Sequence, residues 1–475
     1  MGLVSGVAAA LHTTLNLLLY LLSGGRYLWL EGRLRKGQYK NWGHRFTHTP
    51  SAFLQPDTEA GIIAAVRDNP RLRVVGAGHS FNAGLVSDGA TLSLDRYAGI
   101  LHIDQETRRV RAKAGSRVRD VNRALWAEGL AIKALPSHDA QSLAGIISTD
   151  VHGTGRDVGF VSSSVVAIRV VDGRGEVHAA EVGDELFRCA IGGIGAVGVI
   201  IEVTLECVPT FNLRQATEKV SMTWARANTR RALAEHHHAS FYVFPFSETA
   251  LLHTWNRTTD ATSFLGGARE LFSISVAALS AAWAGALMAH TGTLRLLNRF
   301  AVRFQANTEL VLKSYAGFNR TVYHLHEELE FAVPAADVWA VTDHLIERYE
   351  ALYTAKMPYL IVELRFTPAG HQRAMIGPGV ERETAWINLC LNQSGDYDSY
   401  YAEVEAYLRT IDARPHPGKF CETLDAEDLA RAHGERWRRF QRVRARHDPD
   451  GRFLNPFTQR LLGPVQPPAQ GGHEE

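Results

Sequence analysis

Between residues 48 and 210, short β-branched runs alternate with runs of helical periodicity, and glycine turns separate them. The pattern predicts a helix over 57–66 and then a strand over 72–77 that ends in a glycine loop. It also predicts an amphipathic helix over 118–129 that ends at a glycine. Such an alternation is typical of an α/β or α+β domain.

Two further patterns extend this region. The sequence VVAIRVVDGRGEVHAA contains two strands joined at Asp172-Gly173, which is a strong hairpin signal. A glycine-rich turn over 192–200 then enters a long strand. Beyond Pro209 the chain has mixed strands and helices with more aromatic residues and histidines, up to about Arg414. We interpret that part as a second, substrate-facing domain.

A chain of 475 residues is longer than one hydrophobic core usually organises, so two lobes are expected. The expected segments are an apolar N-terminal segment (1–40), a first domain (41–210), a second domain (211–413), a largely helical C-terminal segment (414–463) and a disordered tail (464–475).

The apolar run from Leu3 to Leu22 is long enough to cross a bilayer, although a histidine, two threonines and an asparagine weaken it. Basic and aromatic residues follow it, namely Arg26, Tyr27, Trp29, Arg33, Arg35 and Lys36. Both an anchor helix and an amphipathic helix on a membrane or on the protein body fit this pattern. A second apolar stretch, 271–289, predicts a buried or membrane-facing helix.

Charge and cysteine content exclude several classes of function. The 51 basic and 50 acidic residues nearly cancel, which argues against nucleic acid as a partner. No CxxC pair is present, so neither a metal site nor a disulfide framework is expected. We expect the cysteines to be buried, reduced thiols, and they are Cys189, Cys207, Cys390 and Cys421.

Two segments carry the composition of a phosphate-binding cradle. The first follows the strand over 72–77 and consists of Gly76, Ala77, Gly78, His79, Ser80, Phe81 and Asn82. Small residues there let backbone N–H groups approach a pyrophosphate, but the loop does not match GxGxxG, which disfavours a nicotinamide site. The second segment, SLAGIISTDVHGTG over 142–155, combines small residues with hydroxyl donors.

The ordered set GAGHSF, SLAGIISTDVHGTG and GGIGAVGVIIEVTLECVP resembles the FAD-binding domain of the vanillyl-alcohol-oxidase superfamily. Within it, the chain is most similar to the sugar-1,4-lactone oxidoreductases, the L-gulonolactone and D-arabinonolactone oxidase family, over about residues 41–462. The resemblance implies an α+β fold with a vanillyl-alcohol-oxidase-type (PCMH-type) FAD-binding domain and an α+β substrate (cap) domain. The C-terminal segment would return to the flavin site.

The resemblance implies FAD as the cofactor, bound covalently through His79 to the 8α-methyl group of the flavin. It also implies that the loop over 76–82 contacts FAD, together with Ser137, Ser142, Gly145, Ser148, His152, Gly153 and Ile200. Asp150 stands where the lactone oxidases commonly have glycine, and we expect it to be tolerated.

Catalytic residues are expected in the second domain and the C-terminal segment. Alternation in YLIVELRF puts Glu363 and Arg365 on one face, either as a buried salt bridge or as a pair that acts on substrate. The resemblance places this pair at the reactive side of the flavin, with Arg365 stabilising a developing alkoxide. It places Lys419 of RPHPGK near the flavin N1 and C2 carbonyl, although Pro417 replaces the usual tryptophan. A solvated lysine at a turn is the alternative.

By the same resemblance, Trp386, Asn388 and His416 belong to the substrate pocket, and Trp386 favours a lactone ring over a polyol. The implied reaction is oxidation of an L-gulono-, L-galactono- or D-arabinono-1,4-lactone by hydride transfer to flavin N5. Reoxidation would use O2 or a membrane electron carrier, as in ascorbate biosynthesis. A sugar-alcohol oxidase and a non-catalytic, membrane-tethered flavoprotein are the alternatives. We expect a cytoplasmic body attached to a membrane by its N-terminal segment.

Overall fold

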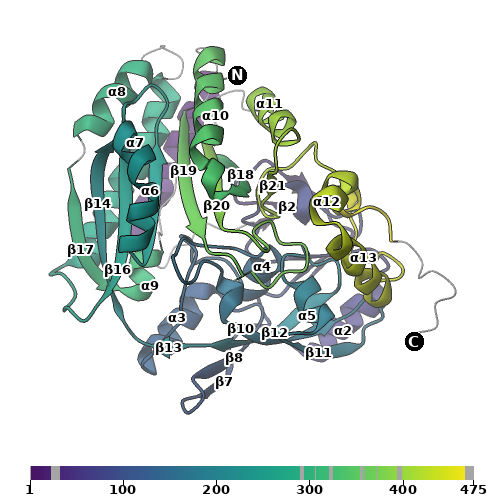
Figure 1. The fold of residues 1–475 in the computed structure, drawn as a ribbon. Helices are drawn as coiled ribbons and strands as arrows, with labels where there is room; N and C mark the ends of the chain where they lie inside the picture. Colours follow the sequence, from purple (N-terminus) through teal and green to yellow (C-terminus); the bar gives the residue numbers. More distant parts are fainter. Residues whose placement is uncertain are drawn as a thin grey trace.

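The structure is a computed structural model, and it describes residues 2–22, 33–288, 294–304, 306–319, 325–353, 357, 359–370, 372–392 and 398–465. The chain forms two lobes with helices and sheets, which confirms the predicted α+β class (Figure 1). We call them the first lobe, which contains a five-stranded sheet, and the cap lobe, which contains an eight-stranded sheet. We propose that the domain boundaries lie at residues 210 and 413.

The first lobe contains an antiparallel sheet in the order β11-β10-β12-β8-β7 and a parallel sheet in the order β4-β6-β5. Its strands are β4 (Phe53–Leu54), β5 (Leu72–Val75), β6 (Ala90–Ser93), β7 (Ile100–Asp104), β8 (Arg109–Lys113), β10 (Val165–Val171), β11 (Val177–Glu181), β12 (Val199–Glu206) and the small pair β9 (Leu130–Ala131) and β13 (Val208–Pro209). Its helices are α2 (Glu59–Asp68), α3 (Val118–Ala127), α4 (Leu143–Ser148) and α5 (Glu185–Ala190).

The local signals read from the sequence account for several of these elements. Thr58 caps α2 by accepting a hydrogen bond from the Gly61 N–H at 3.1 Å. Helix α3 buries Val118, Val121 and Leu125 in the main core of the first lobe. Both predicted helices and the strand after α2 are therefore confirmed.

The predicted hairpin forms as β10 and β11, but its connection is longer than an Asp-Gly turn. Val171 pairs with Val177, so residues 172–176 form the loop, and the positive φ of +74° belongs to Gly175. One carboxylate oxygen of Asp172 accepts hydrogen bonds from the N–H groups of Arg174 and Glu176, both at 2.9 Å. This side-chain cap closes the longer loop.

The cap lobe contains one antiparallel sheet in the order β17-β14-β16-β15-β19-β20-β18-β21. Its strands are β14 (Asn212–Ser221), β15 (His238–Val243), β16 (Thr249–Thr258), β17 (Thr308–Lys313), β18 (His326–Pro334), β19 (Leu360–Thr367), β20 (Thr384–Asn392) and β21 (Arg414–Pro415). Its helices are α6 (Met222–Glu235), α7 (Gly266–Met288), α8 (Leu294–Phe304), α9 (Ser314–Phe318), α10 (Val338–Leu352) and α11 (Asp398–Leu408).

The two faces of this sheet differ in chemistry. One face is apolar, with Leu329, Phe331 and Leu364 among its members, and it packs under residues of α6, α10 and α11 (Figure 1). Because successive side chains of a strand point to opposite faces, the intervening Glu330 and Glu363 project from the other face. That face carries the polar residues from which the candidate site is built.

The C-terminal segment joins both lobes. It starts as β21, which pairs with β18 of the cap sheet. It then forms α12 (Ala426–His433), α13 (Glu435–His447) and α14 (Pro456–Leu462), and residues of all three belong to the core of the first lobe. The predicted helical character is thus confirmed from residue 426 onward, whereas the segment's start is a strand.

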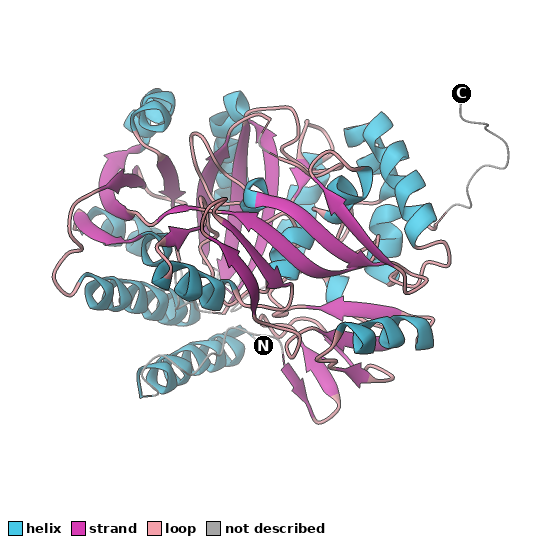
Figure 2. Ribbon diagram, turned by 90° about the horizontal axis from the view of Figure 1, so that it is seen from below, coloured by secondary structure: helices cyan, strands magenta, loops and turns pink. Residues whose placement is uncertain are grey.

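Helix α1 (Gly2–Leu22) lies along the edge of the molecule and packs against α7 (Figure 2). The Trp283 indole N–H donates to the Thr14 hydroxyl at 3.1 Å. Within the described ranges, no helix combines the length and apolarity needed to cross a membrane. A small sheet of β1 (Arg33–Arg35), β2 (Gln38–Lys40) and β3 (Thr47–His48) follows. Arg26, Tyr27, Trp29, Ala289 and the tail from 466 lie outside the described residues.

All four cysteines are free thiols, as the sequence predicted. Cys189, Cys207 and Cys421 are buried, but Cys390 is only half-buried, which corrects the expectation that every cysteine is buried. Burial raises the pKa of Cys421, so it is a neutral, apolar filler beside the lysine loop.

Candidate functional site

A cavity begins at the glycine loop that follows β5. The predicted cofactor contacts that line it are Gly76, Ala77, Gly78, His79, Ser80, Asn82, Ser142, Gly145, Ser148 and Ile200. They come from the loop after β5, from α4 and from the start of β12. Segments far apart in the sequence therefore meet around one elongated space.

The glycine positions in this cradle are fixed by close contacts. A Cβ atom at position 76 would collide with the Ser142 hydroxyl, and Gly78 has a φ of +66°. The Ser142 hydroxyl caps α4 by accepting from the Gly145 N–H at 3.2 Å. Small residues and exposed backbone thus stand where a phosphate-bearing ligand can approach closely.

Arg73 was not predicted, yet it organises one wall of the cavity. Its buried guanidinium donates to the carbonyls of Gly84, Phe453 (3.1 Å) and Ile194 (2.9 Å). Burial lowers the pKa of Arg73 to about 10. Arg73 therefore joins three separate segments through hydrogen bonds to their main-chain carbonyls. None of these three hydrogen bonds goes to a carboxylate.

The cavity continues into a second part, because His79, Ser80, Gln141 and Thr149 line both. The His79 ring stacks on Trp42 at 4.6 Å between centroids and lies 3.9 Å from the ring of His138. Burial lowers the pKa of His79 well below its usual value, and His138, Lys419 and His326 lower it further. Its Nε2 atom has no hydrogen-bond partner among the described residues. His79 is thus a neutral, buried imidazole.

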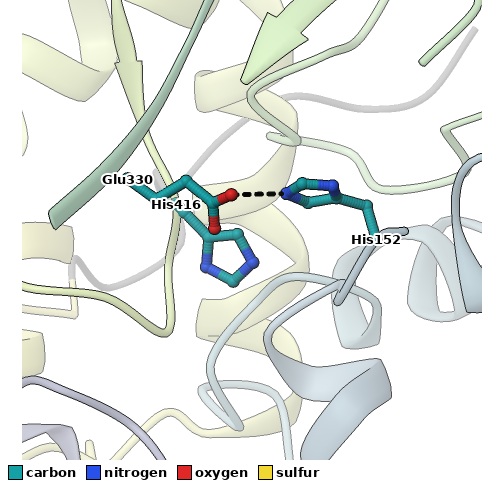
Figure 3. Close-up of side chains that lie close together, drawn as sticks. All are labelled: His152, Glu330 and His416. Carbon is teal, nitrogen blue, oxygen red and sulfur yellow. Dashed lines mark ion pairs between the residues drawn. The ribbon is translucent and has the colours of Figure 1, made fainter. Parts of the chain in front are cut away.

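Three buried side chains point toward one another deeper in this part: His152, Glu330 and His416 (Figure 3). The His152 Nε2 atom lies 3.3 Å from a carboxylate oxygen of Glu330. Burial alone would raise the pKa of Glu330, but His152, His416 and Arg365 hold it at about 2. Burial lowers the pKa of His416 to about 4.

These three residues could hold a metal ion, as could Asp172, His178 and His447 at the β10–β11 loop. The sequence pointed to neither group, because each combines residues from distant segments. In the first group, however, the Glu330 carboxylate already has His152 and Arg365 as charge partners. We assign that group to the polar wall of the site.

Glu363 and Arg365 lie side by side on β19, as the alternation predicted. An Arg365 amino group donates to a Glu363 carboxylate oxygen at 2.5 Å, and the Tyr242 hydroxyl donates to the other oxygen at 2.8 Å. Burial opposes the charge on Arg365, but Glu363 and Glu330 raise its pKa well above the ordinary value. The guanidinium is therefore a fixed positive charge that faces two carboxylates.

Asn388 lies between these groups on β20. It is directly opposite Glu330 on one side and Glu363 on the other, so the three side chains share the polar face. Its side-chain oxygen and nitrogen are buried and have no hydrogen-bond partner within the described part of the chain. Such atoms are costly unless a ligand or water satisfies them. Asn388 is thus well placed to bind a ligand.

The lysine loop reaches the site through β21 and the glycine loop. Asn82 donates to the carbonyls of Pro417 and Lys419, both at 2.9 Å. The Lys419 ammonium forms an ion pair with Glu328 and lies 4.9 Å from the centre of the Phe81 ring. Burial lowers the pKa of Lys419 to about 7.

Trp386 is fully buried and stacks on His152 with 3.8 Å between ring centroids. Its indole N–H donates to the Thr367 hydroxyl at 3.0 Å. Trp386 therefore packs against the His152 ring, and its indole N–H already has a hydrogen-bond partner. Pro417 lines the cavity near the glycine loop.

Asp150 occupies a backbone position that suits glycine, with a φ of +46°. Its carboxylate accepts hydrogen bonds from Ser162 at 2.5 Å and from Gln372 at 2.6 Å. Burial raises its pKa to about 6. The positive φ gives a physical reason for glycine at this position, and the two hydrogen bonds explain how aspartate is accommodated.

The remaining predicted residues lie farther along the same space. Ser137 lines the second part of the cavity and a further, neighbouring cavity, and Gly153 lines only the neighbouring one. Sequence reasoning missed Glu328 and Glu330 of β18, and the rings of His138 and His326. The alternation in HEELEF could have placed both glutamates on one face, but nothing local showed which element that face would meet.

The residues present fit FAD. The glycine cradle suits the pyrophosphate, and the cavity continues past His79 to a pocket with fixed charges, where a flat ring system would lie against Lys419, Arg365 and Glu330. Buried unpaired atoms of His79 and Asn388 also indicate a missing polar partner. This combination matches a cofactor with a phosphate-bearing tail and a reactive ring.

Comparisons with known proteins agree with this fit. A family model for an FAD binding domain matches residues 50–181, and one for D-arabinono-1,4-lactone oxidase matches residues 203–461. L-gulono-1,4-lactone dehydrogenase of Mycobacterium tuberculosis is 27% identical, over 90% of this chain and 99% of its own. L-gulonolactone oxidase of Bos taurus is 24% identical over 90% of this chain and 98% of its own. D-arabinono-1,4-lactone oxidase of Saccharomyces cerevisiae is 30% identical over 47% of this chain and 44% of its own.

Among solved structures, cholesterol oxidase from B. sterolicum has a similar fold, with a TM-score of 0.71. The match covers 91% of this chain and 97% of that one at 17% identity, so it concerns the fold alone. The lactone oxidase model spans more than half of this chain, including β19, β20 and the lysine loop. The chain therefore belongs to the D-arabinono-1,4-lactone oxidase family and is an FAD-dependent oxidoreductase.

Proposed function

We propose that this oxidoreductase oxidises a sugar-1,4-lactone of the L-gulono, L-galactono or D-arabinono type at the carbon that bears the C2 hydroxyl. The observation that carries the proposal is the fixed Arg365 guanidinium, which lines the space continuous with the glycine cradle and is paired with Glu363 of the neighbouring cavity. The activities for which the relatives are named support a lactone as the substrate class.

Each charged side chain then has a role. Arg365 binds the substrate oxygen and stabilises negative charge as its proton leaves, because its planar fork can hold two oxygens at once. Glu363 orients Arg365 through their hydrogen bond and offers a carboxylate that can accept the proton. Lys419, held by Glu328, supplies positive charge at the far end of the same space. Bound FAD supplies the hydride acceptor.

We also propose that His79 carries the flavin covalently. The ring stacks on Trp42 and contacts the ring of His138, so its position is fixed before the cofactor binds. Burial keeps it neutral, which is the form with an available nitrogen lone pair. The unpartnered Nε2 atom, within the described residues, is consistent with a bond to the cofactor.

The proposed reaction is tested by anaerobic reduction of the bound flavin with a panel of aldono-1,4-lactones and polyols, followed by admission of air. We expect the lactones to bleach the flavin absorbance and the polyols to leave it unchanged. Reduction by polyols alone would identify a sugar-alcohol oxidase instead. Reduction by neither class would contradict a catalytic role. Fast return of colour in air identifies O2 as the acceptor, whereas slow return indicates an electron carrier.

A further part of the proposal concerns membrane association. Five leucines of α1 are more than half exposed, and four of them recur at helical spacing, namely Leu11, Leu15, Leu18 and Leu22. Phe272 and Val276 of α7 are exposed as well. The chain that follows α1 is basic, with no acidic residue from Arg33 to Gln55. An apolar ridge beside basic residues suits an anionic lipid surface.

This attachment is tested by flotation with vesicles that contain about one-third anionic lipid, using the full chain. We expect Leu11→Glu with Leu15→Glu to abolish flotation and to leave flavin content unchanged. Leu101→Glu, which changes an exposed leucine of β7 in the first lobe, is the matched control. Flotation of the double variant like the wild type would contradict the proposal.

A further inference from the structure

A neighbouring polar cavity adjoins the second part of the cofactor cavity, which contains His79, and shares Ser137 and Arg365 with it. Its far side is formed by the polar face of the cap sheet and by the first turns of α7. The side chains there are Gln215 of β14, Ser240 and Tyr242 of β15, Trp255 of β16 and Glu270 of α7.

The strand register explains why these residues meet. Tyr242 is directly opposite Glu363, so both side chains project from the polar face. Gln215 is directly opposite Trp255 on the neighbouring strands, so these two share a face as well. Arg365, two residues after Glu363, follows on that same face. The cavity is thus the outward continuation of the Glu363–Arg365 pair along one sheet.

Two of its polar atoms are buried and lack a partner within the described residues: the Ser240 hydroxyl and the Gln215 side-chain oxygen. The Gln215 nitrogen donates to Glu270 at 3.1 Å, which holds the amide in place and leaves its oxygen as an open acceptor. An unsatisfied buried polar atom is costly, so a ligand or water is required there. Both atoms suit a ligand hydroxyl.

Trp255 adds a flat apolar wall. Its indole N–H already donates to the Gly317 carbonyl at 3.0 Å, so the exposed part of the ring offers only carbon. A wall of this kind suits the C–H groups of a sugar chain, while Gln215, Ser240 and Glu270 suit its hydroxyls. Polar and apolar groups on one surface are the chemistry that recognises a polyhydroxylated carbon chain.

We infer that this cavity binds the exocyclic side chain of the lactone, so that the enzyme prefers six-carbon over five-carbon aldono-1,4-lactones. The inference rests on the proposed function, in which Arg365 holds the oxygen at the reacting carbon. A five-carbon lactone has one exocyclic carbon with one hydroxyl, whereas a six-carbon lactone has two of each. The longer side chain reaches past Arg365 and satisfies both the Ser240 hydroxyl and the Gln215 oxygen.

The test compares L-gulono- and L-galactono-1,4-lactone with D-arabinono-1,4-lactone by anaerobic stopped-flow reduction of the flavin in the holoenzyme. The variants are Ser240→Ala and Gln215→Leu. Ser164→Ala is the matched control, because Ser164 is equally buried and its hydroxyl also has no partner among the described residues, but it lies in the first lobe.

We expect the wild type to require about 25–100 times less six-carbon than five-carbon lactone for half-maximal reduction, because two hydrogen bonds are gained. Each variant should raise that concentration about 5–10-fold for the six-carbon lactones only, because a lost hydrogen bond weakens binding without touching the reacting carbon. The limiting rate and the five-carbon values should stay unchanged, and Ser164→Ala should match the wild type. Calorimetric binding of a 2-deoxy six-carbon lactone, which has no C2 hydroxyl to oxidise, should weaken by the same factor.

Reduction by both lactone classes with equal half-saturation, or an unchanged ratio in both variants, would overturn this inference and leave the proposed function intact. A cavity that holds only water gives that result. Failure of every lactone to reduce the flavin would overturn the proposed function and the inference together.

Discussion

Replacing Arg365 by lysine separates a catalytic role of this residue from a structural one. Lysine keeps the positive charge that Glu363 and Glu330 require, so no buried carboxylate loses its counter-ion. Removing the charge altogether would cost about 3–5 kcal/mol of stability, as for a broken buried ion pair. The conservative change avoids most of that cost, and it removes only the planar fork that binds two oxygens.

The expected kinetic effect follows from the chemistry at this position. Loss of one fixed stabiliser of a developing oxyanion costs about 3–4 kcal/mol, or about 10²–10³ in rate. Arg365→Lys should therefore slow anaerobic flavin reduction by that factor, measured by stopped-flow absorbance with saturating lactone. Flavin content and melting temperature should stay near those of the wild type.

Arg382→Lys provides the matched control. The Arg382 side chain is 13% exposed, against 12% for Arg365, and it is also paired with a carboxylate, that of Asp412. It should leave the reduction rate unchanged. If Arg365→Lys reduces flavin at the wild-type rate, or loses flavin and fold together, the catalytic assignment is wrong and the Glu363–Arg365 pair is structural.

The remaining predictions use the same preparations. His79→Ala should release all flavin on acid precipitation, whereas wild-type polypeptide should keep yellow fluorescence after denaturing electrophoresis; free flavin from the wild type would contradict a covalent bond. Because burial lowers the pKa of Lys419 to about 7, its ammonium is lost as the pH rises, and flavin reduction should slow between about pH 6 and about pH 8. Lys419→Arg stays protonated and should flatten that profile; an equally steep profile would assign it to another group. Burial raises the pKa of Asp150 to about 6, so its ionisation costs stability above about pH 4, and this cost reaches its full size above about pH 6. Asp150→Asn should therefore stabilise the fold by about 3 kcal/mol at about pH 8 and by almost nothing near about pH 4, measured by urea unfolding, since Gln372 can turn its amide oxygen toward the new nitrogen. A gain that is equal at both pH values would refute the role of ionisation.

The sequence by itself determined the local elements and the cofactor cradle. Thr58 caps α2, the glycines of the loop over 76–82 allow close approach, and alternation on β19 puts Glu363 beside Arg365. Each of these depends on residues within one turn or one strand, where spacing along the chain equals proximity in space. The order of the motifs also indicated the family, because three weak patterns in one order are far more specific than any one of them.

Only the tertiary structure decided what faces the Glu363–Arg365 pair. Glu330 and Asn388 reach it because β18, β20 and β19 are neighbours in a fixed register. Lys419 meets Glu328 because β21 pairs with β18. Strand order and register are set by packing of the apolar face under α6, α10 and α11, to which residues more than a hundred positions apart contribute.

The neighbouring polar cavity is likewise decided by the tertiary structure. Gln215 and Ser240 read locally as ordinary strand residues, and their burial without a partner becomes visible only when four strands, α7 and the first lobe enclose them. Hydrogen-bond satisfaction is a property of the whole surroundings of an atom, not of its neighbours in sequence. The sequence therefore determines the flavin cradle and the charged pair, and the assembled sheet decides which substrate can lie beside them.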